Sequence, residues 1–161
     1  MALSSLGVNM GYVSTLIIAL ISAGAGAYFA ILKSKKERLW SDRYEALKEV
    51  VLTLGTVESR FSSSHMEQLG VSVISRAESK KLSDEWPVAM YSLRENIAKL
   101  QLLFKDTDIS ALHEAVVELN SAFTDAYHGN PIDMPENHET IAIRAKAAAK
   151  AAIAIGQKHC L

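Results

Sequence analysis

Residues 11–32 have the sequence GYVSTLIIALISAGAGAYFAIL, which contains no charged side chain. A helix of about 22 residues is roughly 33 Å long, enough to cross a hydrocarbon core of about 30 Å. In lipid every backbone N–H and C=O needs an internal partner, and a helix supplies nearly all of them. We therefore expect residues 11–32 to form one transmembrane helix.

The flanks of this segment predict its orientation. Residues 1–10 contain no Lys or Arg, whereas four basic side chains follow the segment directly: Lys33, Lys35, Lys36 and Arg38. Positive charge stays on the cytoplasmic side of a membrane helix. We therefore expect residues 1–10 outside the cell and residues 33–161 in the cytoplasm, as in a single-pass protein of the inner (plasma) membrane. The four basic side chains would then contact anionic lipid at the membrane surface.

A cleaved signal peptide is the alternative interpretation of the same segment. Ala23-Gly24-Ala25 and Ala25-Gly26-Ala27 resemble cleavage sites. A signal peptide begins with a positively charged region, and here the positive charge follows the apolar run. This placement favours the uncleaved transmembrane helix.

Small residues recur at four-residue spacing inside the segment. The first line consists of Thr15, Ala19, Ala23 and Ala27, and the second consists of Ser22, Gly26 and Ala30. The six candidates for helix packing are Ala19, Ser22, Ala23, Gly26, Ala27 and Ala30. Such spacing lets two helix backbones approach closely, so we expect self-association through these six residues. The alternative is that Ala and Gly are simply common in membrane helices.

The remaining chain predicts an all-α protein. The whole chain contains only three prolines and eight glycines, which leaves long stretches free of helix breakers. Apolar residues recur at steps of three and four from Trp40 to Phe61, from Trp86 to Phe104 and from Ile109 to Ala126, a coiled-coil-like period typical of packed helices. An alanine-rich segment follows, which favours a further helix. We expect the transmembrane helix to continue into a four- or five-helix antiparallel bundle.

The helix boundaries carry their own signals. Ser62-Ser63-Ser64 indicates a turn, and we expect a helix over residues 65–82, with a short strand at residues 71–74 as the alternative. The expected caps and stops of the later helices are Asp84, Asp108, Asn137 and Gly156, chosen because Asp and Asn cap helix N-termini and Gly ends helices.

The chain contains no motif of an established enzyme class. It lacks a phosphate-binding G-x-x-x-x-G-K-[ST] loop, a nucleophile elbow and any E-x-x-H pair. The formal net charge of −1 argues against binding of nucleic acid, and a single cysteine, Cys160, excludes an intrachain disulfide. We expect no cofactor and favour a non-enzymatic role.

A polar loop is the one candidate metal site. It gathers imidazoles and carboxylates that could hold zinc: His128, Asp133, Glu136 and His138. Loops at helix ends are polar in any case, so a solvated loop is the favoured interpretation. His65 and His159 stand apart from this group and are expected to be solvated.

The layout is similar to that of many bacterial inner-membrane proteins: a short translocated N-terminus, one span, a basic flank and a helical domain. Some proteins of this layout are membrane effectors in anti-phage systems. The sequence favours a membrane-anchored interaction module that binds a protein partner or self-associates at the cytoplasmic membrane surface. The alternative is a membrane-perturbing effector whose anchors cluster on activation.

Overall fold

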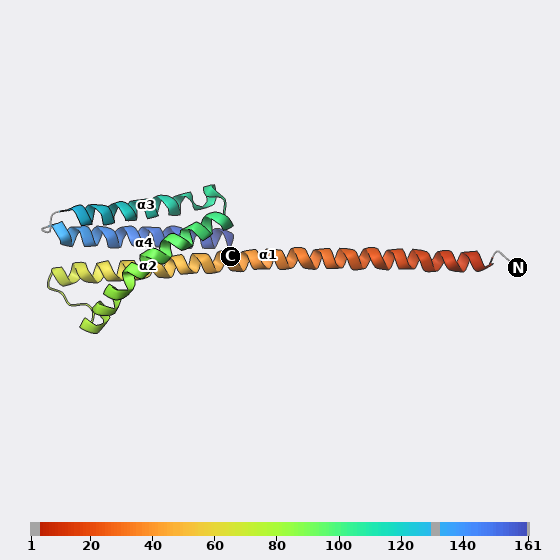
Figure 1. Cartoon of the computed structure of the whole chain (residues 1–161), viewed down its shortest axis with the longest axis horizontal. Coiled ribbons are helices and arrows are strands. Elements are labelled where there is room, and N and C mark those ends of the chain that lie inside the picture. The colour runs from red at the N-terminus through yellow and green to blue at the C-terminus, as the bar shows by residue number, and fades with distance from the viewer. Residues whose placement is uncertain (1–3, 130–132, 161) are drawn as a thin grey trace. The chain divides into compact units, whose positions relative to one another are not determined.

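The computed structural model describes residues 4–129 and 133–160, with side chains described at Thr15, at Ile18 and from Leu20 onward. Over these residues the regular secondary structure is entirely helical, which confirms the expected all-α class. The helices are α1 (Ser4–Gln68), α2 (Arg76–Leu103), α3 (Asp106–His128) and α4 (Met134–His159) (Figure 1). The chain divides into two compact units, Met1–Trp40 and Ser41–Leu161, called here unit 1 and unit 2.

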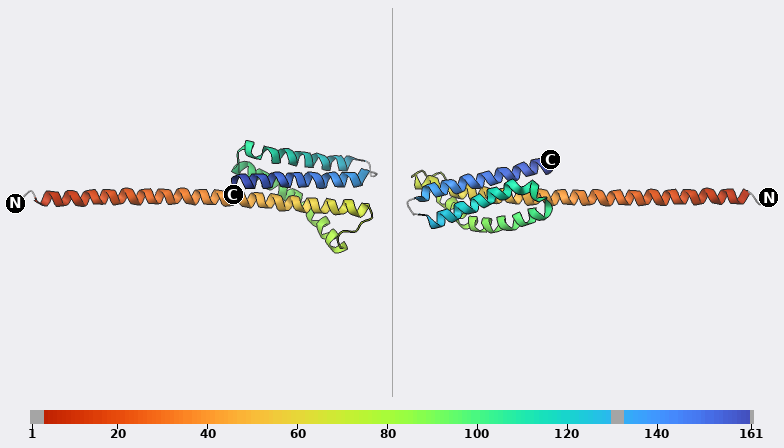
Figure 2. Two further views of the ribbon diagram at one scale, coloured as in Figure 1. Left: turned by 180° about the vertical axis from the view of Figure 1, so that it is seen from behind. Right: turned by 90° about the horizontal axis from the view of Figure 1, so that it is seen from above.

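Unit 2 is a bundle built from residues 41–68 of α1 and from the three later helices. Helices α3 and α4 lie side by side and antiparallel, whereas α2 crosses the bundle obliquely (Figures 1 and 2). The core consists of aliphatic side chains, two phenylalanines and the small residues of α4, which allow close approach. Its most deeply buried members are Val50, Leu54, Val57, Leu93, Leu100, Leu112, Leu119, Ile141, Ala145, Ala148 and Ala152.

The apolar stripes predicted for α2 and α3 face this core. Leu93 and Leu100 of α2 are buried, as are Ile109, Leu112 and Leu119 of α3. The stripe predicted for α1 is partly wrong. Trp40 and Tyr44 are about half exposed, and Val50 and Val57 are buried in their place, because the core of unit 2 only begins at Ala46.

The predicted turn at Ser62-Ser63-Ser64 is wrong, since α1 continues through it to Gln68. The Ser64 side chain is buried, and its hydroxyl accepts a hydrogen bond of 2.7 Å from Arg60. Gly70, with φ +80°, ends the helix instead. Gly70 N–H donates to Glu67 O and Val71 N–H donates to Met66 O, the two bonds of a Schellman cap. Glycine adopts this left-handed conformation without a steric penalty.

Helix α2 begins eight residues before the predicted cap at Asp84, which is therefore wrong. Ser75 is the N-cap, and its hydroxyl accepts a hydrogen bond from Glu78 N–H. Residues 65–82 are thus divided between α1, a short connection and α2, and the described part of this segment has no strand. Pro87 lies inside α2 rather than in its first turn.

Three further predicted boundaries are also displaced. Helix α3 begins at Asp106 and α4 at Met134, so neither Asp108 nor Asn137 is the N-cap. Gly156 lies within α4, which continues to His159. Gly129 follows α3, and a Cβ there would lie 2.8 Å from Asp125 O. Only glycine fits this close approach.

None of the helices, over the described part of the chain, combines the length and hydropathy that a membrane span needs.

Candidate functional site

Unit 1 contains a long series of exposed apolar side chains on α1. The largest are Ile18, Leu20, Ile21, Tyr28, Phe29, Ile31 and Leu32. Ile21 is 66% exposed and Phe29 68% exposed. A helix that is apolar on every side lacks the polar face that a water-exposed helix needs. Among the described side chains, residues 18–32 of α1 show no such polar face.

The small residues predicted to mediate helix packing lie in the same part of α1. Ser22, Ala23, Gly26, Ala27 and Ala30 are exposed. A Cβ added at Gly26 would meet no atom within 4 Å, so a second helix would have room to approach there. The side chain of Ala19 lies outside the described residues.

The four basic residues predicted to contact the membrane surface are exposed: Lys33, Lys35, Lys36 and Arg38. Lys33 Nζ lies 3.9 Å from Glu37 Oε1, with both side chains largely exposed. Exposed pairs of this kind contribute little to stability. The four positive charges of this segment are therefore accessible to solvent and are hardly neutralised within the chain.

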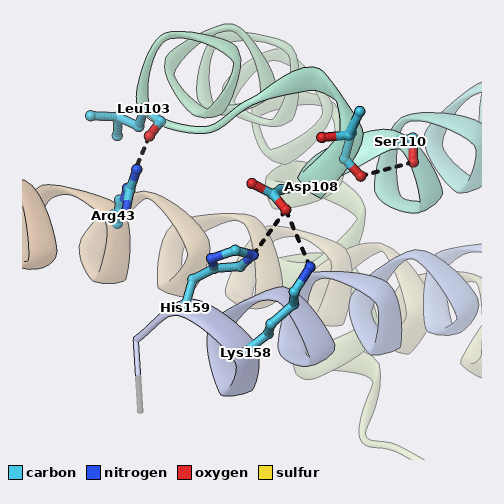
Figure 3. A network of polar contacts seen from close by, with 7 residues as sticks. Arg43, Leu103, Asp108, Ser110, Lys158 and His159 are labelled. Carbon is cyan, nitrogen blue, oxygen red and sulfur yellow. Dashed lines mark hydrogen bonds and ion pairs between the residues drawn. The ribbon is translucent and has the colours of Figure 1, made fainter.

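Polar contacts join α3 and α4 at one end of unit 2 (Figure 3). Asp108, near the start of α3, accepts a hydrogen bond of 3.2 Å from Lys158 of α4. His159 Nε2 lies 3.3 Å from the same carboxylate oxygen without hydrogen-bond geometry. The hydrogen bond from Lys158, followed by the nearby positive charges, lowers the pKa of Asp108 below 3.8. The expectation that His159 is solvated is therefore wrong.

Arg43 anchors α1 to the same end of the bundle. Its Nε donates a 2.9 Å hydrogen bond to Leu103 O at the end of α2. Its guanidinium carbon lies 4.8 Å from the centre of the Phe104 ring, a cation–π contact. Cys160 is buried nearby, and burial raises the pKa of its thiol. A neutral buried thiol is a poor nucleophile and a poor metal ligand.

The opposite end of unit 2 contains the residues proposed as metal ligands. The described residues contain no group of three or more His, Cys, Asp or Glu side chains arranged to hold a metal ion. His128 is exposed at the end of α3, and Asp133 and Glu136 are exposed around the start of α4. His138 instead packs edge-on against Phe61, with ring centres 5.3 Å apart.

His138 is held in an apolar setting. Its Nδ1 atom is buried and has no hydrogen-bond partner among the described residues. Burial, followed by the positive charge of Arg60 and the neighbouring His65, lowers the pKa of His138 below 6.5. His65 Nδ1 in turn lies 2.8 Å from Pro135 O, so the expectation that His65 is solvated is also wrong.

Sequence reasoning missed the side chains that surround His138. Arg60, Ser64 and His65 lie in or next to the segment Ser62-Ser63-Ser64, which was predicted to be a turn and is part of α1. Once the helix is extended, the four-residue spacing of Arg60 and Ser64 places them on one face. The overlooked signal was Gly70, which marks where the helix ends.

No known protein family, curated protein or solved structure matches this chain.

Proposed function

We propose that the chain is a single-pass membrane protein whose helical bundle binds a protein partner, or a second copy, at the cytoplasmic surface. In this proposal residues 11–32 lie in the lipid and unit 2 lies in the cytoplasm. The observation that carries it is the run of exposed apolar side chains from Ile18 to Leu32. Each large side chain among them would gain about 1.5–3 kcal/mol from leaving water.

Lipid is the cover we favour, because the apolar run is followed at once by basic residues. The absence of a qualifying span concerns only the described residues. Residues 11–14, 16, 17 and 19 of the proposed span lie outside those with described side chains. The exposed positive charges from Lys33 to Arg38 support a cytoplasmic flank, since Lys and Arg are retained on that side.

Alkaline carbonate extraction of membranes from expressing cells tests the anchor. The full chain should stay in the pellet, and a variant lacking residues 1–40 should be released into the supernatant. The same variant should keep its helical circular dichroism, because the core of unit 2 begins at Ala46. Release of the full chain by carbonate would contradict the proposal.

The partner-binding surface we favour is a groove between α1 and α4, with a cavity volume of about 370 Å³. Its edges are formed by exposed apolar side chains, Leu52 and Ile153. Cross-linking in intact membranes followed by mass determination should yield a product larger than the monomer. Leu52→Glu and Ile153→Glu should abolish it, whereas Val117→Glu, at an exposed position on α3, should not. A cross-linking pattern indifferent to all three changes would rule this groove out.

A second candidate function is a membrane-perturbing effector whose anchors cluster on activation. The exposed small residues of unit 1 and the open space at Gly26 support it. Overexpression should then arrest growth and admit an impermeant dye, and Gly26→Leu should prevent both effects. Gly24→Leu is the matched control, because Gly24 is equally open and lies off the two lines of small residues. Equal behaviour of the two variants would remove this candidate.

A further inference from the structure

The end of unit 2 that contains His138 is hollowed. A cavity of about 370 Å³ opens there and is lined by residues from all four helices, including Arg60, Trp86, Phe123 and His138. This volume lies within the range of small-molecule sites. Because every helix contributes to its wall, the cavity is a feature of the assembled bundle and not of one helix.

Aromatic rings form a large part of this wall. The Phe61 ring packs edge-on against Trp86 and Phe123, with centroid distances of 5.3 and 5.2 Å. Trp86 and Phe123 are stacked, 5.7 Å apart and 8° from parallel. Mutually packed rings of this kind resist rearrangement and present flat apolar surfaces. The wall thus favours a planar, aromatic occupant.

The charge on the cavity wall is positive. Arg60 lines the cavity, and its guanidinium donates a hydrogen bond to the Ser64 hydroxyl, a neutral acceptor. No carboxylate side chain lines the cavity among the described residues, and the nearby Glu58 pairs with Lys146 at 3.4 Å instead. A guanidinium has five donors in a planar fork that suits a carboxylate, so most of its donors are available to an anion.

His138 adds a second group that an anion would favour. Its Nδ1 atom is buried and makes no hydrogen bond, so a bound ligand could supply the missing partner. A negative charge nearby favours the protonated imidazole, in which both ring nitrogens are donors. A cationic ligand would instead be repelled by Arg60 and would further disfavour protonation of His138.

We propose that this cavity binds a small aromatic carboxylate, with its ring against Phe61, Trp86 and Phe123 and its carboxylate on Arg60. Such a site goes beyond partner binding, because it would let the bundle respond to a soluble metabolite. It also stands apart from the membrane anchor, so the two proposals can fail separately.

Another hollow on the same bundle provides the internal comparison. It lies between α2 and α3, has a volume of about 640 Å³, and also contains an arginine, Arg94. Among the described residues its only aromatic rings are those of His113 and Tyr91, and Tyr91 is 69% exposed. Without a packed aromatic wall, Arg94 offers charge alone.

The test measures binding of para-trifluoromethylbenzoate and its neutral amide to the full chain in lipid nanodiscs by fluorine NMR line broadening. The carboxylate should bind saturably and at least about tenfold more tightly than the amide, as expected for a hydrogen bond to a charged group. Arg60→Gln should weaken carboxylate binding about tenfold and remove the preference, whereas Arg94→Gln should change neither. Equal affinity for the two probes, absence of saturable binding, or an unchanged Arg60→Gln variant would overturn the proposal.

A second pair of variants guards against loss of folding. Ala126→Phe fills the cavity without removing charge and should abolish binding of both probes. Arg60→Lys keeps the charge without the planar fork and should retain only part of the preference. Thermal melting by circular dichroism identifies variants that still fold. Binding that survives Ala126→Phe would place the site elsewhere and refute the assignment.

Discussion

Helix α1 runs through both units, and its described apolar side chains are mostly buried in unit 2 but exposed in unit 1. In unit 2 its residues alternate between the core and the surface, and Leu54 is completely buried. In unit 1 its apolar residues occur on every side, and Phe29 is 68% exposed. Helix formation alone therefore says little about the surroundings of a segment. The arrangement of its apolar residues is more informative. A helix with one apolar stripe packs that side against a neighbour, whereas a helix that is apolar on all sides is typically buried on all sides.

The largest expected effect contrasts a buried leucine of unit 2 with an exposed isoleucine of unit 1. Leu54→Ala should lower the free energy of unfolding of the bundle by about 2–5 kcal/mol, because it removes packed methyl groups and leaves a cavity. Ile21→Ala should change it by less than about 0.5 kcal/mol. Urea unfolding of both variants, followed by circular dichroism, measures the difference. Similar losses would mean that unit 1 contributes to the folded core.

A charge placed in each region gives the next largest effect. Ile21→Lys should disfavour membrane insertion by about 2.5–3.5 kcal/mol, and the fraction resistant to carbonate extraction should fall. Ile153→Lys, at an exposed position of α4, is the matched control and should leave that fraction unchanged. If both variants pellet like the parent chain, residue 21 does not lie in the lipid core.

The success of sequence reasoning differed between helix faces and helix ends. The α2 and α3 faces were predictable, because Leu93, Leu100 and Leu112 follow the helical period that burial requires. Most of the ends were not, because they depend on packing between helices. Ser64 stays helical although serine favours turns, and its side chain is buried in the bundle, which local turn preference does not reveal.

The candidate cavity was still harder to anticipate. Its wall combines Arg60 of α1, Trp86 of α2, Phe123 of α3 and His138 of α4. These positions are far apart in the sequence and meet only through the packing of four helices. Of the four, only His138 was singled out, and for a metal role that the described residues do not form.

The dependence of stability on pH is a smaller effect and distinguishes the two ends of unit 2. The pKa of His138 is lowered below 6.5 by burial, followed by the charge of Arg60. The unfolded chain therefore binds a proton first, and the free energy of unfolding should fall as pH decreases below 6.5. His138→Phe should remove this slope. Urea unfolding from pH 7 to pH 5 tests it, and an unchanged slope would exclude His138 as its source.

Asp108 acts in a lower pH window. Its pKa is lowered below 3.8, chiefly by the hydrogen bond from Lys158. The stabilisation from this carboxylate is present above pH 3.8 and should be lost as pH falls through the lowered value. Asp108→Asn should remove that additional acid-induced loss. Urea unfolding from pH 5 to pH 3 measures it, and an unchanged loss in the variant would exclude Asp108 as its source.

The central claim is that unit 1 crosses the membrane and unit 2 lies in the cytoplasm, and cysteine labelling tests it most directly. The native Cys160 is buried, so it is first replaced by alanine. Single cysteines are then introduced at Leu102, which is 88% exposed on α2, and at Ser5. An impermeant maleimide should label Ser5→Cys in intact cells and Leu102→Cys only after the cells are opened. Labelling of Leu102→Cys in intact cells would contradict the account.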